Sequence, residues 1–392
     1  MGYHNTMFNQ LLQEIPRHEF EMSVAEHGGD RYVKKFSCWS QFVVLLYAQI
    51  RGLKSLREIE TGLRVQAGKW YHLGLRSVSR STISDSNGKR DWRIWEGLFY
   101  RTLSRCRDLT PGHKFRFKNP LYALDSTLVS LCLSLYPWAR FRRRKGALKI
   151  HTLLDQRGTL PAFVVVSAGD RHDVKVAEES DLPLEPDSII VMDRAYIDFK
   201  WLWGLHSRGV WFVTRAKRNL DYDIAGQQEV PKNRGVLFDY SIRLRGYHAR
   251  LNYPATLRLV GFVDKETGEE FVFLTNHMGF GATTIAEIYK SRWQIELFFK
   301  WIKQNLKIKT FLGASFNAVM TQIWVAMIYY LMLAYVKYQT RCRHSMTELS
   351  RILRETLMQR IGLIDILSLK PDSLILLARG HPSSQLQLFP GQ

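Results

Sequence analysis

Four polar residues recur at the spacing of one helix face. Tyr289, Arg292, Glu296 and Lys303 follow one another at offsets of 3, 4 and 7 residues. At about 100° per residue, these offsets confine the four side chains to an arc of roughly 60°. The other positions of the predicted helix are mostly apolar, namely Ile288, Trp293, Ile295, Leu297, Phe298, Phe299, Trp301 and Ile302. A helix that is apolar on nearly every other face is buried, and a buried polar stripe needs a partner or a function.

The ordinary explanation for such a stripe is a solvated helix face with ion pairs. That explanation fits poorly, because Arg292 precedes Glu296, which is the weaker orientation for an ion pair on a helix. Tyr289 adds nothing to such a pair. We therefore interpret the stripe as functional.

Two further acids stand in or after apolar runs that predict strands. Asp125 lies in the tetrapeptide Leu-Asp-Ser-Thr, and Asp193 directly follows the run Ile189–Met192. Carboxylates at strand ends of an α/β sheet lie where ligands usually bind. Either acid alone is better explained as a turn or capping residue, but their combination with Glu296 favours a site. Asp173, after His172, is the reserve acid if Asp193 is not the second member.

Three carboxylates beside a basic groove suit a hard divalent cation, Mg²⁺ or Mn²⁺. Two such ions about 4 Å apart can activate an attacking oxygen and stabilise a leaving one. Water and a DNA 3′-hydroxyl can both serve as the nucleophile, and no covalent intermediate is needed. We predict that Asp125, Asp193 and Glu296 bind two metal ions and catalyse cleavage and joining of phosphodiester bonds.

The charge of the chain favours a polyanionic partner. Lys and Arg number 56 against 36 Asp and Glu, a formal net charge of +20, and 46% of the 392 residues are hydrophobic. This composition excludes wholesale disorder, and the length predicts two or three domains. Nucleic acid is the first candidate partner. Acidic lipid is the competitor, but it calls for a basic amphipathic helix or a lipid anchor.

The densest basic cluster lies between positions 140 and 145. Its members are Arg140, Arg142, Arg143, Arg144 and Lys145, with Trp138 and Phe141 interleaved. A solvated loop is the simpler interpretation. The interleaved aromatic residues favour a nucleic-acid strand that is stacked and neutralised there.

Several other classes of protein are disfavoured. The longest apolar run, Ile323–Val336, is too short to cross a bilayer and predicts a buried core helix. No secretory signal is readable at the start, and the four scattered cysteines suit a reducing cytoplasm. The segment Gly62–Lys69 resembles a phosphate loop, but it has one residue too many between its glycines and is followed by Trp70 instead of Ser or Thr.

The first 110 residues predict a helical bundle. Apolar residues recur at helical spacing from Ser37 to Ile50 and again from Ile94 to Leu103, and Ser55 with Glu58 predicts a capping box between them. The polar, basic segment Ser77–Arg90 is either a helix-turn-helix-like DNA reader or a polar connector.

An α/β pattern follows a linker at Pro111–Pro120. Strands are predicted at Leu121–Leu131, Leu148–Leu154, Leu160–Val166, Ser188–Met192 and Val210–Thr214, with a helix at Trp201–His206. The polar segment Asp221–Gly235 then precedes further strands at Val236–Thr275, including a hairpin turned at Asp264–Gly268. Helices resume at Thr284.

We expect five segments. These are a helical DNA-binding domain at 1–110, a first part of the catalytic core at 111–216, a β-rich insertion at 217–280, a second part of the core at 281–340, and a helical region with a tail at 341–392. The fold class is α/β.

The motifs resemble one known family. The spacing Tyr-x2-Arg-x3-Glu-x6-Lys from Tyr289 to Lys303, preceded by Leu-Asp-Ser-Thr at Asp125 and Met-Asp-Arg-Ala-Tyr at Asp193, resembles the insertion-sequence-four type of DDE transposase. The amino-terminal text, including Asp-Arg-Tyr at 30–32 and Lys-Phe-Ser at 35–37, resembles one branch of that family. The likeness covers nearly the whole chain.

The resemblance implies a ribonuclease-H-like catalytic core interrupted by the β-rich insertion. It assigns the metals to the three acids and assigns DNA phosphates to Tyr289, Arg292 and Lys303. Family members cut a DNA element out, in some cases through a hairpin, and insert it elsewhere as multimers. The partner would be double-stranded DNA, bound by a homo-oligomer at the nucleoid in a bacterial cytoplasm. An aromatic residue of the insertion can stack on a flipped base, and Trp211 and Phe273 are the candidates.

Two alternatives differ in class. A non-catalytic protein that only binds element ends would keep the basic bundle but need not keep all six polar residues. A structure-specific nuclease would share the metal chemistry and lack strand joining.

Overall fold

The computed structural model describes residues 5–132, 134–142, 145–230, 234–305 and 311–368. The chain divides into a helical unit, Met1–Leu109 with Met320–Gln392, and an α/β unit, Thr110–Val319. The segment predicted as a linker, Pro111–Pro120, contains no helix or strand. The sequence-based boundary at 340 lies after the one that separates the units, because residues from Met320 onward group with the helical unit.

The amino-terminal helices of the helical unit follow the predicted apolar patterns. Their bounds are α1 Met7–Gln13, α2 Arg17–Glu26, α3 Cys38–Arg51, α4 Leu56–Val65, α5 Trp70–Leu73, α6 Arg80–Lys89 and α7 Arg93–Arg107. Ser55 caps α4 by accepting a hydrogen bond from the Glu58 backbone N–H. Glu58 accepts from the backbone of Lys54 and not of Ser55, so the predicted capping box is shifted by one residue.

The segment 77–90 contains the helix α6 (Arg80–Lys89), and this helix does not by itself decide between the DNA reader and the polar connector. Ser79 caps α6 by accepting from the Thr82 N–H. Ile83 and Asn87 are the buried positions of α6, which packs against α4. Its remaining polar side chains are mostly left at the surface.

The long apolar helix α13 (Phe316–Gln339) is a core helix, as predicted, although it is longer than the apolar run. By length and composition it could cross a membrane, but 94% of its most apolar window is buried inside the protein. Trp324 packs against Phe99 at 5.1 Å and Trp92 at 6.4 Å between ring centroids. The chain continues through α14 (Met346–Thr356), which begins with a full capping box formed by Ser345 and Glu348, and α15 (Leu363–Ser368).

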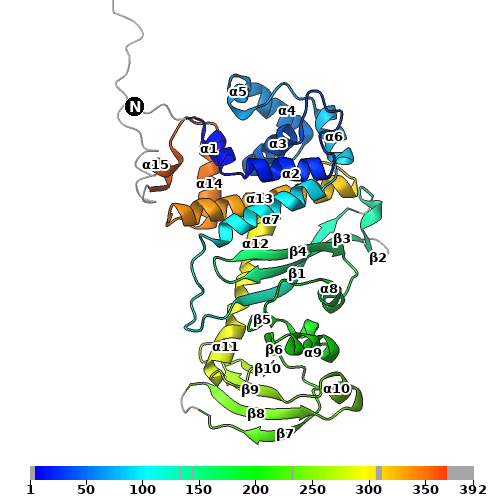
Figure 1. Cartoon of the computed structure of the whole chain (residues 1–392), viewed down its shortest axis with the longest axis vertical. Helices are drawn as coiled ribbons and strands as arrows, with labels where there is room; N and C mark the ends of the chain where they lie inside the picture. The colour runs from blue at the N-terminus through cyan, green and yellow to red at the C-terminus, as the bar shows by residue number, and fades with distance from the viewer. Residues whose placement is uncertain (1–4, 133, 143–144, 231–233, 306–310, 369–392) are drawn as a thin grey trace, which may run out of the picture. The chain divides into compact units, whose positions relative to one another are not determined.

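Ten strands in the described part of the α/β unit form one sheet (Figure 1). Their bounds are β1 Leu121–Leu131, β2 Arg140–Arg142, β3 Lys145–Asp155, β4 Leu160–Ala168, β5 Ile189–Met192, β6 Trp211–Arg215, β7 Tyr222–Gln227, β8 Val236–Leu244, β9 Leu257–Val263 and β10 Glu270–Thr275. The order is β2-β3-β1-β5-β6-β10-β9-β8-β7, and β4 also pairs with β3. Among the described strands, β1, β5 and β6 are the ones that pair in parallel. The strands predicted between 121 and 214 are all present.

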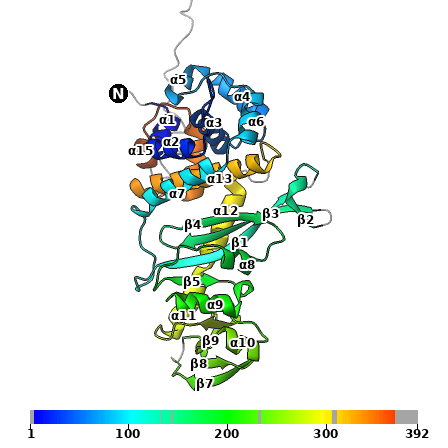
Figure 2. The same ribbon diagram turned by 45° about the vertical axis from the view of Figure 1, so that its right-hand side comes forward.

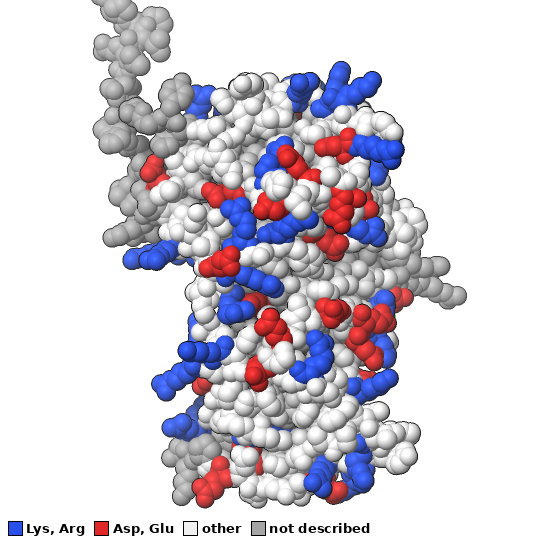
Figure 3. All heavy atoms as spheres, viewed as in Figure 1, with Lys and Arg blue, Asp and Glu red and all other residues white. Residues whose placement is uncertain are grey.

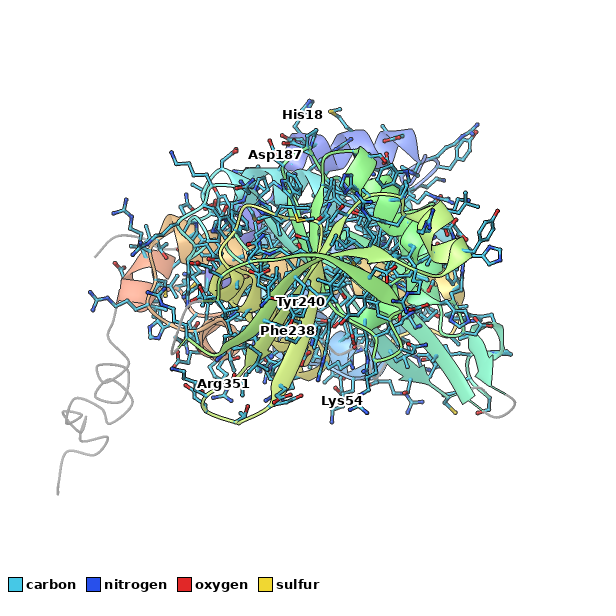
Figure 4. The ribbon with its side chains drawn as sticks, turned by 90° about the horizontal axis from the view of Figure 1, so that it is seen from below. His18, Lys54, Asp187, Phe238, Tyr240 and Arg351 are labelled. Carbon is cyan, nitrogen blue, oxygen red and sulfur yellow. The ribbon has the colours of Figure 1, made fainter. Side chains whose placement is uncertain are left out.

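The β-rich segment extends the same sheet, because β10 pairs with β6. The hairpin predicted at Asp264–Gly268 joins β9 to β10, with Gly268 at φ 71°. Two elements were missed: β7 lies in the polar segment predicted as turns, and the helix α10 (Tyr247–Asn252) lies among the predicted strands. Phe238 and Tyr240 stack on β8 with ring centroids 4.7 Å apart (Figure 4). Gly261 of β9 is required there, since an added Cβ would lie 2.4 Å from the Phe238 ring.

Helices cover the two faces of the sheet differently (Figures 1 and 2). The helices α8 (Asp173–Glu179) and α9 (Phe199–Ser207) enclose a core with Leu124, Met192 and their even-numbered neighbours. The helices α11 (Ala282–Ser291) and α12 (Trp293–Asn305) pack on the sheet from the other side. Successive side chains on a strand point to opposite faces, so Asp125 and Asp193 point toward α11 and α12.

A buried arginine fixes the connection between β10 and α11. Arg258 and Asp239 have side chains only 2% and 3% exposed, and two hydrogen bonds of 2.8 and 2.6 Å join them. Arg258 also donates to the backbone carbonyls of His277, Met278 and Phe280. This connection leads into the helix that carries Tyr289, so the ion pair contributes to positioning that side chain.

Replacing Arg258 by Met is expected to lower the free energy of unfolding by about 3–5 kcal/mol, because Asp239 is left as a buried, uncompensated charge. Urea denaturation followed by circular dichroism measures this loss. Adding Asp239→Leu is expected to recover part of it. The control is Arg245→Met, whose partner Asp223 is well exposed; an equal loss in the control would contradict the assignment.

Candidate active site

The parallel pairing of β1 with β5 sets Asp125 beside Asp193. Leu124 is the register partner of Met192, and each acid directly follows one of these residues. Adjacent strands lie about 4.8 Å apart, so the two carboxylates leave neighbouring strands at the same level and on the same face. The pairing of Leu124 with Met192 could not be predicted from the sequence alone.

Arg292 connects this pair of strands to α12. Its Nη1 lies 3.2 Å from Asp125 Oδ2, and its Nη2 donates to Glu296 Oε1. Glu296 is therefore brought to the same place as Asp125 through a shared guanidinium group. The Arg292 side chain is 16% exposed, and its Nε has no hydrogen-bond partner among the described residues. A buried donor without a partner is costly, and an anionic ligand would satisfy it.

The acids act on one another electrostatically. Burial raises the pKa of Asp125 to about 6, and the charges of Asp193 and Glu296 add to this increase. The backbone N–H of Ser126 and the charge of Arg292 act in the opposite direction. Burial thus opposes ionisation of Asp125 despite the nearby guanidinium, and a bound cation would favour its charged form.

By residue type the acids fit a hard divalent metal ion, but their arrangement is not that of a finished metal site. Over the described ranges, no group of three His, Cys, Asp or Glu side chains is close enough to hold a metal ion. Arg292 lies between Asp125 and Glu296 and pairs with both. Metal binding therefore requires Arg292 to leave these carboxylates.

The predicted single helix is interrupted at the site. Helix α11 ends at Ser291, and Arg292 is its C-cap before α12 begins at Trp293. The prediction that the helix is apolar and buried on nearly every other face is also wrong in part, because Trp293 is 57% exposed and Leu297 is 41% exposed. The ion pair between Arg292 and Glu296 forms despite its weaker orientation, since both are held beside Asp125.

The other two members of the stripe differ in their surroundings. The Tyr289 ring packs against Phe273 at 4.9 Å, and the Arg292 guanidinium lies 5.8 Å from its centroid. Burial and the charge of Asp193 raise the pKa of Tyr289. Lys303 is exposed on α12, two turns after Glu296. Tyr289 thus lies among the acids, whereas Lys303 lies farther along the helix.

A second polar network, which the sequence did not reveal, lies on the opposite face of β1. Asp173, the reserve acid, accepts a hydrogen bond from Ser126 at 2.6 Å and forms an ion pair with Lys149 at 3.2 Å. It also lies 3.6 Å from His151, whose pKa burial lowers to about 4. Asp173 is engaged by these partners. Unlike Asp125 and Asp193, it does not follow one of the residues that pair between β1 and β5. Only the strand alternation between Asp125 and Ser126 could have indicated it.

The basic cluster lies at the β2–β3 end of the sheet (Figure 2). Arg143 and Arg144 lie outside the described residues, and the side chains of Arg140, Arg142 and Lys145 are likewise not described. Trp138 is engaged within the protein, because its Nε1 donates to the Ala314 carbonyl and its ring packs on Phe316. Its stacking on a nucleic-acid strand is therefore less favoured than the sequence indicated.

An aromatic cavity of about 390 Å³ adjoins the site. Its walls include Phe262, Phe271, Phe273, Tyr289, Arg292 and Trp293. Phe273, one of the two candidates for base stacking, is a buried wall residue. Trp211, the other candidate, packs instead against His277 at 4.8 Å.

Carboxylates on adjacent parallel strands, faced by an acid on a crossing helix, define a class of enzyme that acts on phosphodiesters. Comparison with known proteins agrees. The family model "Transposase DDE domain" matches residues 116–332, more than half of the chain, and a "Domain of unknown function (DUF4372)" matches residues 3–76. The chain belongs to the DDE transposase family, whose reaction uses divalent metal ions and whose substrate is DNA.

Relatives of this chain are transposases of insertion sequences. It is 30% identical to the "Probable transposase for insertion sequence element IS5377" of Geobacillus stearothermophilus, over 87% of each chain. It is 25% identical to the "Putative transposase for insertion sequence element IS4SA" of Synechocystis sp., over 79% of this chain and 86% of that one. A solved piggyBac transposase synaptic complex with hairpin DNA has a TM-score of 0.47 at 10% identity, covering 96% of this chain and 80% of the other. The protein is an insertion-sequence transposase.

Replacing Asp125 by Asn is expected to change the pH dependence of stability. Between pH 4 and pH 6 the native Asp125 holds a proton that the unfolded chain has released, so the wild-type free energy of unfolding falls as pH rises through this window, by up to about 3 kcal/mol. The Asn variant should lack this decrease and be at least as stable as wild type at neutral pH. Denaturant titrations across this range measure the difference. A variant destabilised equally at every pH would make Asp125 a structural partner of Arg292.

Proposed function

We propose that the enzyme is of the insertion-sequence-four type, with a ribonuclease-H-like core and the Tyr-Arg-Glu-Lys signature at Tyr289, Arg292, Glu296 and Lys303. The observation that carries this proposal is the shared placement of Asp125 and Glu296 around Arg292, next to the strand that ends at Asp193. The strand order β4-β3-β1-β5-β6, with the last three in parallel, supports the core.

Asp125, Asp193 and Glu296 would hold two Mg²⁺ or Mn²⁺ ions, which would activate the attacking oxygen and stabilise the leaving one. Arg292, released from the acids, would then bind the scissile phosphate with its freed guanidinium. Tyr289 and Lys303 would hold neighbouring phosphates. The same site can serve water for cutting and a DNA 3′-hydroxyl for joining.

Asp125→Asn, Asp193→Asn and Glu296→Gln are each expected to reduce Mg²⁺-dependent nicking at the element ends to background while leaving DNA binding largely intact. Each substitution keeps the side-chain shape and removes a metal-binding charge. A gel assay of cleavage, paired with fluorescence anisotropy for binding, measures both properties. Retained cleavage in any variant removes that residue from the site. Strand joining by the wild type separates a transposase from a structure-specific nuclease.

Arg292→Ala and Lys303→Ala should weaken the complex with cut DNA more than they weaken binding of Mn²⁺.

The basic cluster at 140–145 would contact DNA outside the cut, and the reaction would be carried out by a homo-oligomer on DNA at the bacterial nucleoid. The helical unit would bind the element ends through α6 in the manner of a helix-turn-helix.

The aromatic cavity would receive a base flipped out of the duplex. Its volume lies in the range of small-ligand sites, and aromatic faces stack on bases without regard to sequence. The well-exposed Trp293 and the partly exposed Phe271 are better placed for this contact than buried Phe273.

Trp293→Ala is expected to weaken the complex with element-end DNA by about 1–3 kcal/mol, the usual contribution of one stacked base. 2-Aminopurine placed at successive positions of the end measures stacking directly, because stacking quenches its fluorescence. Trp211→Phe is the control, since Trp211 does not line the cavity. Equal quenching in wild type and Trp293→Ala would rule out this contact.

A further inference from the structure

A strongly basic loop joins α2 to α3 in the helical unit. Its tip consists of five consecutive exposed residues, namely Arg31, Tyr32, Val33, Lys34 and Lys35. Three of the five are cations, and no acid occurs between Arg31 and Ser37. Figure 3 shows that, on the face in view, basic side chains are mostly interspersed with acidic ones. The loop is therefore a local concentration of positive charge with an aromatic residue within it.

A buried arginine holds the base of this loop. Arg90, which directly follows α6, donates to the Gly29 and Ser37 carbonyls and to Gln41 Oε1, and its Nη2 donates to the Phe36 carbonyl. These acceptors lie at both ends of the loop and on α3. The Arg90 side chain is only 9% exposed. The cations at the tip are thus carried by a fixed base, which lowers the entropy cost of binding through them.

Asp30, the acid that directly precedes Arg31, is engaged at the base of the loop. Asp30 accepts a hydrogen bond from the Cys38 N–H at 2.7 Å and lies 3.6 Å from Arg90. Gly29 lies so close to α7 and α3 that an added Cβ would be 2.5 Å from the Ile94 side chain and 2.7 Å from Cys38 Sγ. The tip therefore keeps its positive charge uncompensated by Asp30.

Tyr32 is held in a conformation that non-glycine residues rarely adopt. Its φ is 61°, and its side chain is 86% exposed. The Arg31 guanidinium lies 5.0 Å from the centre of the ring and donates to the Tyr32 hydroxyl at 3.2 Å. A bulky residue in left-handed backbone is strained, and such strain persists where the surrounding structure enforces it. The result is an aromatic face presented to solvent beside a cation.

The loop and α6 belong to one surface. Arg90 ties the end of α6 to the loop, and Asn87 of α6 accepts a hydrogen bond from Gln41 of α3 at 2.8 Å. Lys89, at the end of α6, is exposed next to this junction. Two basic features far apart in the sequence are therefore adjacent and rigidly connected.

We propose that the loop Arg31–Lys35 is a DNA-contacting element that acts together with α6 on the same duplex. Arg31, Lys34 and Lys35 neutralise backbone phosphates, and Tyr32 packs its ring against a sugar or an exposed base edge. This gives a role to the domain of unknown function at residues 3–76, and it rests on the proposed binding of element ends by the helical unit. A protein partner is disfavoured, because charged residues and lysine in particular are depleted from protein interface cores.

The test uses the full chain and a fluorescein-labelled duplex of the terminal repeat flanking the coding region, with anisotropy measured over a range of salt concentrations. The variant Lys34→Ala/Lys35→Ala is expected to weaken binding and to reduce the slope of log Kd against log salt by about two, one per phosphate contact. Tyr32→Gly is expected to weaken binding roughly tenfold with little change in slope. Glycine adopts φ 61° readily, so this variant keeps the fold. Tyr32→Phe should bind nearly as wild type.

The matched control is Arg343→Ala/Arg351→Ala. Both are exposed cations: Arg351 lies in α14 and Arg343 in the connection just before it, and α14 lies on the other side of the helical unit from α6 in the view of Figure 1. If wild type and both double variants bind with equal affinity and slope, the loop proposal is overturned while end binding stands. If the loop variants lose oligomerisation in light scattering but keep DNA affinity, the loop is a protein interface and the proposal is also overturned. Failure of wild type to bind the duplex would instead overturn the proposed function and the loop proposal with it.

Discussion

The structure of the site depends on Arg292, whose guanidinium joins Asp125 of β1 to Glu296 of α12. The parallel register of β1 and β5 makes Asp125 and Asp193 neighbours, and α12 adds Glu296. Burial raises the pKa of Asp125, and the charges of Asp193 and Glu296 add smaller increases. Arg292 acts in the opposite direction and pairs with both Asp125 and Glu296. The proposed function therefore requires Arg292 to exchange these carboxylates for a phosphate when metal ions bind.

The two faces of the sheet carry different features of the site. The face under α11 and α12 carries the acids, and the face under α8 and α9 carries a large apolar core together with the network of Ser126, Asp173 and Lys149. Because Ser126 follows Asp125 directly, this network holds the strand at the point where the site begins. The extension of the sheet by β7–β10 adds the aromatic cavity at the other side of Tyr289. One sheet thus supports the three acids and a neighbouring aromatic cavity.

Helical and strand elements with a strong local period were predicted well. The strand Leu121–Leu131, the run Ile189–Met192 and the stripe from Ser37 to Ile50 are present where the pattern indicated. The elements that were missed lack such a period. The strand β7 has glycine and several polar residues and is recognised only through its pairing with β8, and α10 is a short helix between two strands. The break at Arg292 is set by the contacts of its side chain with Asp125 and Glu296, which no helical period reveals.

The sequence by itself determined which acids are available, the spacing of Tyr289 to Lys303, and the net positive charge that favours a polyanionic partner. These properties belong to residue types and local intervals. Only the tertiary structure decided that Asp193 and not Asp173 lies beside Asp125, that Arg292 pairs with two acids, and that Arg90 joins α6 to a basic loop. Each of these contacts joins residues far apart in the chain, and their geometry follows from strand register and helix packing, which local periodicity does not encode.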